Sequence, residues 1–349
     1  MAQPGAALQN EPKTVLIYVG ADLVGDGLMK LPFARAVRAA FPGAHISWVA
    51  GKGKSTYAHE LASLVAGLLD EVIEQAGFDR AVQFIVRWPL DGRHFDLVID
   101  TQRGVPASLL LRRIRHDGFI TGAADFWLSD RRPPPGYKRP AAMVRQMLDL
   151  VELASGRKVS FGAPLKLDAS VVEAAGRALP AGPVYVGFAP GAGGAHKRWP
   201  LENFIALAID QSGHGRIPVF VLGPEEVDLT GKIAGAVPGA LFAAPTDPER
   251  QDGAPPGISP SPAFTIAAAA RLAAAVVNDS GAGHMIAAAD VPLVSLFGPT
   301  PPAKFAPAAT ALTVITAQDF GAGEDMASIP LSAVRDALEG ALEGALERA

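Results

Sequence analysis

The chain has 349 residues, of which 49% are hydrophobic, and its formal net charge is -4. A chain of this length exceeds the usual size of a single hydrophobic core, so we expect two domains. The slightly acidic balance argues against nucleic acid as a partner, because phosphate binding normally requires a strongly basic surface. The absence of cysteine excludes disulfides, thiolate nucleophiles and metal sites built on cysteine.

Two features of the sequence bear on location. The first thirteen residues contain no apolar segment of the kind found in signal peptides, so we expect a cytoplasmic protein. The most apolar stretch, residues 263–277, contains Arg271 and is shorter than the roughly 20 residues that cross a bilayer. Contact with a membrane, where it occurs, is therefore expected to be peripheral.

The first half of the chain alternates apolar runs with helix-length segments. Strands are predicted at Thr14–Val19, Ala44–Ala50, Glu71–Ile73 and Phe95–Asp100, and a helix at Met29–Ala40. This alternation indicates a parallel sheet covered by helices. The helix-poor stretch 156–164 precedes a domain boundary, and we expect residues 1–170 to form the first domain.

The second half repeats this organisation. Strands are predicted at Val184–Phe188, Pro218–Leu222, Ala275–Val277 and Leu293–Phe297, and helices at Leu201–Gln211, Asp228–Ala236, Pro262–Leu272 and Gly281–Ala288. Residues 245–262 are crowded with proline, glycine and aspartate, which predicts a loop. We expect residues 171–328 to form a second doubly wound domain. Residues 329–349 are predicted to form a C-terminal helix that aligns Leu338, Leu342 and Leu346 on one stripe.

The loop after the first strand contains a candidate catalytic carboxylate. Ligands of open parallel sheets bind beyond the carboxyl ends of the strands, and there Gly25 and Gly27 flank Asp26 just before the predicted helix. Asp26 could act as a general base toward a hydroxyl group. The alternative is an N-cap residue bonded to backbone amides, and the local sequence favours the cap.

A glycine-rich turn follows the first strand of the second half. It runs from Ala189 to Pro200 and includes Gly191, Lys197 and Arg198. Small residues let backbone amides approach an anion, and the adjacent cations neutralise it. A flexible turn with solvated charges explains this segment equally well.

A third loop leads from a strand into a helix of small residues. Asp279 and Ser280 precede Gly281, Gly283 and His284. The free amides of a helix N-terminus would point at a diphosphate, and His284 could donate a hydrogen bond to it. The competing interpretation of His284 is a structural histidine. Asp279 suits a capping or hydroxyl contact better than a phosphate contact, because like charges repel.

Basic residues concentrate between Arg103 and Arg145, where nine arginines and lysines stand against three aspartates. This excess favours an anionic acceptor or a membrane surface, and Arg103, Arg112 and Arg113 are the candidates for acceptor contacts. The alternative is that these arginines cap and coat helices. No metal site is predicted, because the sequence contains no H-E-x-x-H motif and no Asp-x-Asp pair.

Several of these segments resemble glycosyltransferase family 9, the heptosyltransferases, in the same order along the chain. The resemblance runs from Lys13 to about Pro307. Segments similar to the opening of that family are Gly25-Asp26 with Leu31-Pro32, Ala40-Phe-Pro-Gly-Ala44 and Phe95-Asp-Leu-Val-Ile-Asp100. The more specific segments are Lys197-Arg-Trp-Pro200, Asn278-Asp-Ser-Gly-Ala-Gly-His284 and Leu296-Phe-Gly-Pro-Thr300. One departure is Gly298-Pro-Thr-Pro-Pro302, where the family usually has Gly-Pro-Thr-Asp-Pro.

The resemblance implies a GT-B fold, in which two doubly wound Rossmann-like α/β domains face a cleft. The N-terminal domain would receive an anionic, lipid-linked saccharide such as a lipopolysaccharide core, at the cytoplasmic face of the inner membrane. The C-terminal domain would bind a nucleotide sugar, usually ADP-heptose. Transfer would proceed by direct displacement with inversion and without a metal or other cofactor.

The resemblance also implies roles for individual residues. Asp26 matches the catalytic base of the family. Donor-phosphate contacts would come from Lys197 and from the group formed by Asp279, Ser280, Gly281, Gly283 and His284, with Gly191 and Arg198 beside them. Nucleoside contacts would come from Glu225 or Glu226.

Two other functions compete with this one. The chain could be a GT-B transferase for a different nucleotide sugar, or an epimerase acting on one. It could also be a non-catalytic sugar-nucleotide-binding protein, in which Asp26 would be dispensable.

Overall fold

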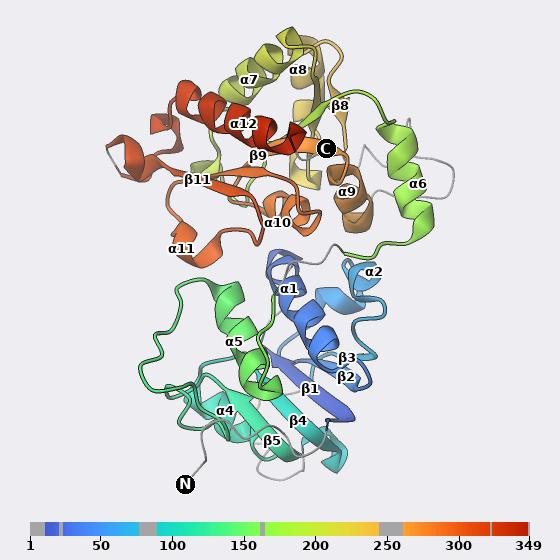
Figure 1. Ribbon diagram of the computed structural model, residues 1–349, viewed down its shortest axis with the longest axis vertical. Helices are drawn as coiled ribbons and strands as arrows, with labels where there is room; N and C mark the ends of the chain where they lie inside the picture. The colour runs from blue at the N-terminus through green and yellow to red at the C-terminus, as the bar shows by residue number, and fades with distance from the viewer. Residues whose placement is uncertain are drawn as a thin grey trace. The chain divides into compact units, whose positions relative to one another are not determined.

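The computed structural model describes residues 11–20, 24–76, 89–160, 165–243, 261–321 and 323–347. The chain forms two compact units, Met1–Phe161 and Gly162–Ala349, and each contains one parallel β-sheet (Figure 1). The fold is therefore the α/β class with two parallel sheets that the sequence predicts. Of the predicted loop 245–262, residues 245–260 lie outside the described part of the chain.

The first unit is built on a five-stranded parallel sheet with the order β3-β2-β1-β4-β5. Its strands are β1 (Thr14–Val19), β2 (His45–Ala50), β3 (Glu71–Ile73), β4 (His94–Asp100) and β5 (Arg115–Thr121). Its helices are α1 (Val24–Ala40), α2 (Ala62–Val65), α4 (Val105–Leu111) and α5 (Met143–Ser155), with 3₁₀ turns η1 (Thr56–Ala58) and η2 (Pro89–Gly92). The chain runs from β1 outward to β3 and then crosses to β4, so the strand order reverses between β1 and β4.

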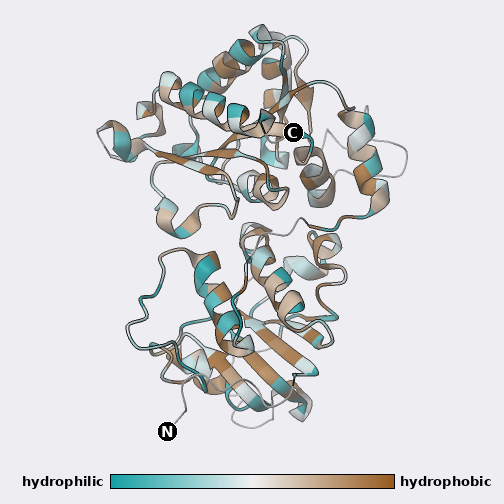
Figure 2. Ribbon diagram, in the orientation of Figure 1, coloured by the Kyte–Doolittle hydropathy of each residue, from teal (hydrophilic) through white to brown (hydrophobic). Residues whose placement is uncertain are grey.

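Helices cover both faces of this sheet. Phe33 of α1 packs against Trp48 of β2, and α1 also packs against α5. Val49 follows Trp48 in β2, so its side chain points to the opposite face of the sheet. On that face Val49 belongs to a hydrophobic cluster with Leu111 of α4. Because both faces are covered, the strands read as nearly continuous apolar runs, which are brown in Figure 2.

The second unit is built on a six-stranded parallel sheet with the order β11-β10-β9-β6-β7-β8. Its strands are β6 (Tyr185–Ala189), β7 (Ile217–Phe220), β8 (Leu241–Phe242), β9 (Leu272–Asn278), β10 (Leu293–Phe297) and β11 (Leu312–Thr316). Its helices are α6 (Ala169–Ala178), α7 (Leu201–Gly213), α8 (Leu229–Ala236), α9 (Pro262–Ala269), α10 (Gly281–Ala288), α11 (Pro302–Phe305) and α12 (Leu331–Leu346). The 3₁₀ turns are η3 (Ala195–Lys197), η4 (Pro224–Glu226), η5 (Ala317–Phe320) and η6 (Met326–Ser328). Here the strand order reverses between β6 and β9.

Two helices connect the ends of the second unit to its core. Ala175 of α6 and the following Leu179 belong to one of its hydrophobic clusters, and the division between the two compact units precedes α6. Helix α12 packs on β9 and β10, and its Leu338 and Leu342 are fully buried, as the predicted stripe requires. The side chain of Leu346 lies outside the described part of the structure. None of the helices in the described residues is both long and apolar enough to cross a membrane.

Two predicted boundaries are wrong. Helix α1 begins at Val24 instead of Met29, which places Gly25, Asp26 and Gly27 inside its first turn. An N-cap precedes the first helical residue, so Asp26 is not the cap. The helix predicted at Pro262–Leu272 ends at Ala269, and Leu272 already belongs to β9. The run of alanines in this stretch lacks the periodicity that separates a buried helix from a central strand.

Candidate active site

Four loops of the second unit leave the carboxyl edge of neighbouring strands. The glycine-rich turn follows β6, the turn with Glu225 and Glu226 follows β7, Asp279 follows β9, and Thr300 lies beyond β10. Since β9 pairs with both β6 and β10, three of these loops meet around the point where the strand order reverses. Such a switch point is where open parallel sheets bind ligands.

Lys197 is held at this point by an ion pair that sequence reasoning did not predict. Its ammonium group donates to Asp279 Oδ2 at 3.0 Å, although the two residues are 82 positions apart. Thr300 Oγ1 donates to the same carboxylate oxygen at 2.6 Å. Asp279 is therefore not placed as a phosphate ligand. Its negative charge instead positions the ammonium group of Lys197, which could bind a phosphate. The side chain of Lys197 is 28% exposed.

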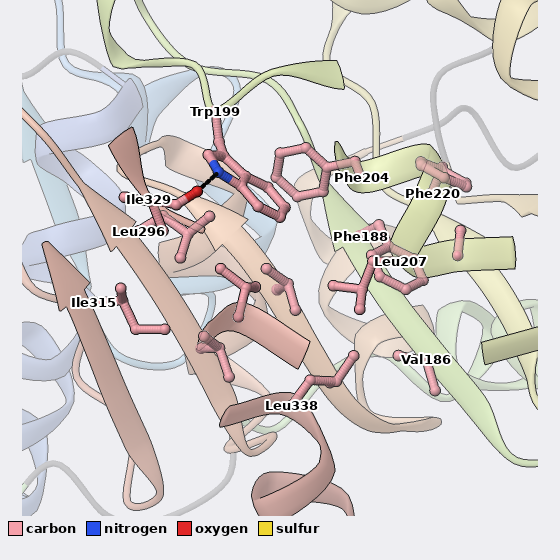
Figure 3. Close-up of a cluster of buried hydrophobic side chains, with 14 of the residues drawn as sticks. Val186, Phe188, Trp199, Phe204, Leu207, Phe220, Leu296, Ile315, Ile329 and Leu338 are labelled. Carbon is pink, nitrogen blue, oxygen red and sulfur yellow. Dashed lines mark hydrogen bonds between the residues drawn. The ribbon is translucent and has the colours of Figure 1, made fainter. Parts of the chain in front are cut away.

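The segment that carries Lys197 is anchored in the core by Trp199. This side chain is 1% exposed, and its indole N–H donates to the Ile329 carbonyl oxygen at 3.0 Å (Figure 3). Its backbone N–H donates to Asn278 Oδ1 at 3.1 Å, and Asn278 Nδ2 donates to the Pro190 carbonyl at 2.8 Å. Buried Asn278 thus ties the turn after β6 to the end of β9, which fixes the place of Lys197 beside Asp279.

Arg198 forms a second ion pair, with Glu226. Its Nη2 donates to Glu226 Oε1 at 3.1 Å and to the Ala192 carbonyl at 3.0 Å. Glu226 also accepts from the Gly223 amide at 3.1 Å and its side chain is only 8% exposed, so both charges are satisfied within the protein. A Cβ on Gly191 would lie 2.6 Å from the Glu226 carboxyl carbon. Gly191, Arg198 and Glu226 therefore shape the turn, whereas Glu225, with 77% of its side chain exposed, is accessible to a ligand.

Helix α10 begins at the same switch point. Ser280 is its N-cap, but the side chain caps no amide, and Ser280 Oγ is buried without a hydrogen-bond partner among the described residues. Gly281 and Gly283 lie in the first turn, and half-buried His284 follows them. An unsatisfied hydroxyl and free helix amides together form a donor set suited to an anion.

Asp26 lies in the first turn of α1, at the switch point of the first sheet. Its side chain is half-buried, and it makes no hydrogen bond or ion pair with the residues that the structure describes. A carboxylate without such partners keeps its lone pairs available to accept a proton.

A small cavity lies at the carboxyl edge of the first sheet. Its volume is about 80 Å³, and three of its lining side chains are the cations Lys30, Arg103 and Arg139. Arg139 is fixed by a 2.9 Å bond to the Gly122 carbonyl and by stacking on Phe126. The cavity has room for one charged substituent of a ligand.

The structure separates the three arginines predicted to contact an acceptor. Arg103 lines the cavity after β4. Arg112 and Arg113 follow α4, which runs back to the amino end of β5, at the opposite edge of the sheet. Arg112 is also paired with Asp130 at 3.0 Å and stacks on Phe119. Arg112 and Arg113 are thus placed away from the cavity.

A buried carboxylate organises the cavity wall. Asp100 is fully buried and accepts from Ser108 Oγ at 2.5 Å, Thr121 Oγ1 at 2.9 Å and the Gln102 amide at 2.8 Å. Burial raises the pKa of Asp100 to about 6 although these hydrogen bonds oppose the shift. The network joins β4, α4 and β5 and so fixes the turn that carries Arg103.

Within the described residues, two groups of side chains have the spacing of metal ligands. They are His94 with Asp96 and Asp117, and Asp210 with His214 and Glu339. In the second group Arg216 lies 2.7 Å from Glu339, so that carboxylate is already neutralised. Neither group includes a residue of the two switch points described above.

Two doubly wound units, the second with a cation and a helix N-terminus at its switch point, have the α/β architecture of the GT-B fold class. Residues 86–246 and 263–328, more than half of the chain, match the sequence profile of Glycosyltransferase family 9 (heptosyltransferase). The chain belongs to this family and is a glycosyltransferase, which confirms the resemblance described for the sequence. Comparison with curated protein sequences gives no significant match.

Solved structures share the fold over nearly the whole chain. A family 9 glycosyltransferase of Veillonella parvula is 19% identical, with a TM-score of 0.71 over 97% of this chain and 99% of that one. The ADP-heptose lipopolysaccharide heptosyltransferase II of E. coli is 21% identical, with a TM-score of 0.63 over 96% and 100%. The E. coli heptosyltransferase WaaC with ADP is 20% identical, with a TM-score of 0.64 over 94% and 99%.

Proposed function

We propose that this glycosyltransferase transfers a heptose from ADP-heptose, with inversion, to an anionic lipid-linked saccharide of the lipopolysaccharide core type. The observation that carries the proposal is the meeting of Lys197, Asp279 and the N-terminus of α10 at the switch point of the second sheet. A cation and free amides at one place stabilise a departing diphosphate. The structural neighbours include an ADP-heptose heptosyltransferase and a heptosyltransferase solved with ADP, which supports the choice of donor.

Each step of the transfer has a candidate residue. Asp26, whose carboxylate has no partner among the described residues, would take the proton from the acceptor hydroxyl as it attacks the anomeric carbon. Lys197, Ser280 Oγ and the first amides of α10 would bind the diphosphate as the glycosidic bond to it breaks. Exposed Glu225 would bind ribose hydroxyls, while Glu226 keeps its bond to Arg198.

The acceptor would place an anionic substituent in the cavity of the first unit. Lys30, Arg103 and Arg139 supply the positive charge there, and the volume of about 80 Å³ admits a group of phosphate or carboxylate size. This assignment replaces Arg112 and Arg113 with Lys30 and Arg139. No metal or other cofactor has a role in this proposal.

The test is nucleoside diphosphate release from ADP-, GDP- and UDP-sugars, with heptose-deficient lipopolysaccharide as the acceptor. We expect ADP release from ADP-heptose that requires the acceptor and falls at least 100-fold in Asp26→Asn, in the range that general bases contribute. The control is Asp336→Asn, the same change at an exposed carboxylate on α12, which should retain full activity. Release from a GDP- or UDP-sugar instead would refute the proposed donor, and full activity of Asp26→Asn would refute the proposed base.

A further inference from the structure

Helix α4 exposes apolar side chains on its outward face. Val105 and Leu109 lie one turn apart and are 40% and 51% exposed, while Ser108 and Leu111 on the inward face are fully buried. A helix that covers a sheet normally turns polar residues outward. Helix α4 is apolar on both faces, and none of the described elements covers the outer one.

Trp127 extends this apolar face. It is 68% exposed, the highest value among the large apolar side chains that the structure describes as exposed. Its segment of the chain reaches the C-terminal end of α4, because the C-cap residue Arg112 donates from Nη1 to the carbonyl oxygen of Leu128, the residue after Trp127, at 2.5 Å. We call Val105, Leu109 and Trp127 the α4 patch. Exposed apolar residues that gather in one place mark an interaction surface.

Unneutralised cations flank the α4 patch. The nearby aspartates are already paired, since Asp130 binds Arg112 at 3.0 Å and Asp125 binds Arg139 at 3.3 Å. Arg113, one turn beyond Leu109, has no carboxylate partner among the described residues. Within the described part of the chain, exposed Arg132 donates only to the Trp127 carbonyl, at 3.3 Å. The surroundings of the α4 patch are therefore positively charged, although the whole chain carries a formal net charge of -4.

We propose that the α4 patch docks the enzyme on an anionic lipid bilayer. Tryptophan and aliphatic side chains enter the headgroup region, and arginines beside them bind lipid phosphates. A second copy of this chain would bring the same positive charge to the contact, so charge complementarity favours the bilayer. The patch is also near the cavity of the first unit along the chain, because the lining residues Arg103 and Phe126 precede Val105 by two positions and Trp127 by one.

The residues of the α4 patch are none of the candidate catalytic or donor-binding residues. The docking can therefore fail or hold independently of the sugar that the enzyme transfers. It gives Arg113 a function at the edge of the sheet where the structure places it, away from the cavity.

The experiment is co-sedimentation of the full chain with vesicles of phosphatidylglycerol and phosphatidylcholine, compared with phosphatidylcholine alone. We expect binding to the anionic vesicles that weakens as salt is raised, because salt screens arginine–phosphate attraction. The double variant Leu109→Ser with Trp127→Ser should lose at least tenfold in affinity. The double variant Arg113→Ser with Arg132→Ser should lose roughly fivefold per arginine. The matched control is Ile209→Ser, because Ile209 is 50% exposed on α7 of the second unit and should not affect binding.

Two further measurements keep the test decisive. Circular dichroism establishes that each variant is folded, and the Asp26→Asn variant should bind vesicles like the wild type whatever its activity. Wild-type protein that ignores anionic vesicles, or patch variants that bind them unchanged, would overturn the docking proposal. Sedimentation velocity would also overturn it by revealing a dimer that the Leu109→Ser and Trp127→Ser changes dissociate, since the patch would then be a protein interface.

Discussion

Lys197 depends on two neighbours for its position. A lysine side chain has several rotatable bonds, and the contact with Asp279 Oδ2 at 3.0 Å selects one arrangement of them. Thr300 donates to the same oxygen at 2.6 Å, and in the proposed mechanism it would keep that oxygen hydrogen-bonded when the ammonium group turns toward a diphosphate. We therefore propose that Thr300 is a positioning residue, which would make it easier for Asp279 to release Lys197 during transfer.

Removal of this hydroxyl should slow transfer. In Thr300→Val the shape of the side chain is kept, but the charged carboxylate of Asp279 loses the hydrogen bond that the threonine hydroxyl donates, worth about 1.5–3 kcal/mol. We expect kcat to fall about tenfold, since 1.4 kcal/mol corresponds to that factor, while KM for the acceptor changes little. Thr300→Ser retains the donor and should restore most of kcat. Steady-state kinetics with both variants would contradict this role if Thr300→Val turned over like the wild type.

At the scale of elements, the fold class can be predicted from the sequence, because strands that are covered on both faces, such as β1 and β10, are continuous apolar runs. Strand β5 was not predicted, because it begins with the polar residues Arg115, His116 and Asp117. The start of α1 was also missed, since two glycines in its first turn weaken the helical pattern.

The candidate site can likewise be predicted from the sequence only in part. The loops with Lys197, Asp279 and His284 could be predicted, because strand ends and small residues mark them locally. The bond from Lys197 to Asp279 could not, because only the pairing of β6 with β9 brings these loops together. The cavity cations Lys30 and Arg139 come from α1 and from a loop beyond β5, and no local motif connects them.

The glycine-rich turn after β6 allows a prediction with a control in the same turn. In Gly191→Ala the new Cβ would lie within 2.6–2.9 Å of the Glu226 carboxylate, which Arg198 and the Gly223 amide hold in place. The turn must move, and we expect ADP affinity to fall at least tenfold. In Gly193→Ala the Cβ meets no atom within 4 Å, so its affinity should equal that of the wild type. Isothermal titration calorimetry with ADP distinguishes the two, and equal affinities would show that the turn does not depend on the Glu226 contact.

At the scale of the whole molecule, the second unit contains both a complete core and every proposed donor residue. Phe188, Trp199 and Leu338 belong to one buried cluster that joins the sheet to α12. Lys197, Asp279 and Ser280 lie on loops of the same sheet. The proposed donor site therefore requires no residue from the first unit.

The fragment Gly162–Ala349, expressed alone, should consequently fold and bind ADP. A single compact core predicts one cooperative thermal transition, and ADP should raise its midpoint because a ligand that binds only the folded state stabilises it. Calorimetry should give a Kd for ADP close to that of the full chain, and we expect Lys197→Ala to weaken ADP binding equally in the fragment and in the full chain. The fragment should not release ADP from ADP-heptose with acceptor, because Asp26 is in the other unit. A folded fragment that fails to bind ADP would mean that the first unit supplies nucleotide contacts, and the donor residues would then have to be reassigned.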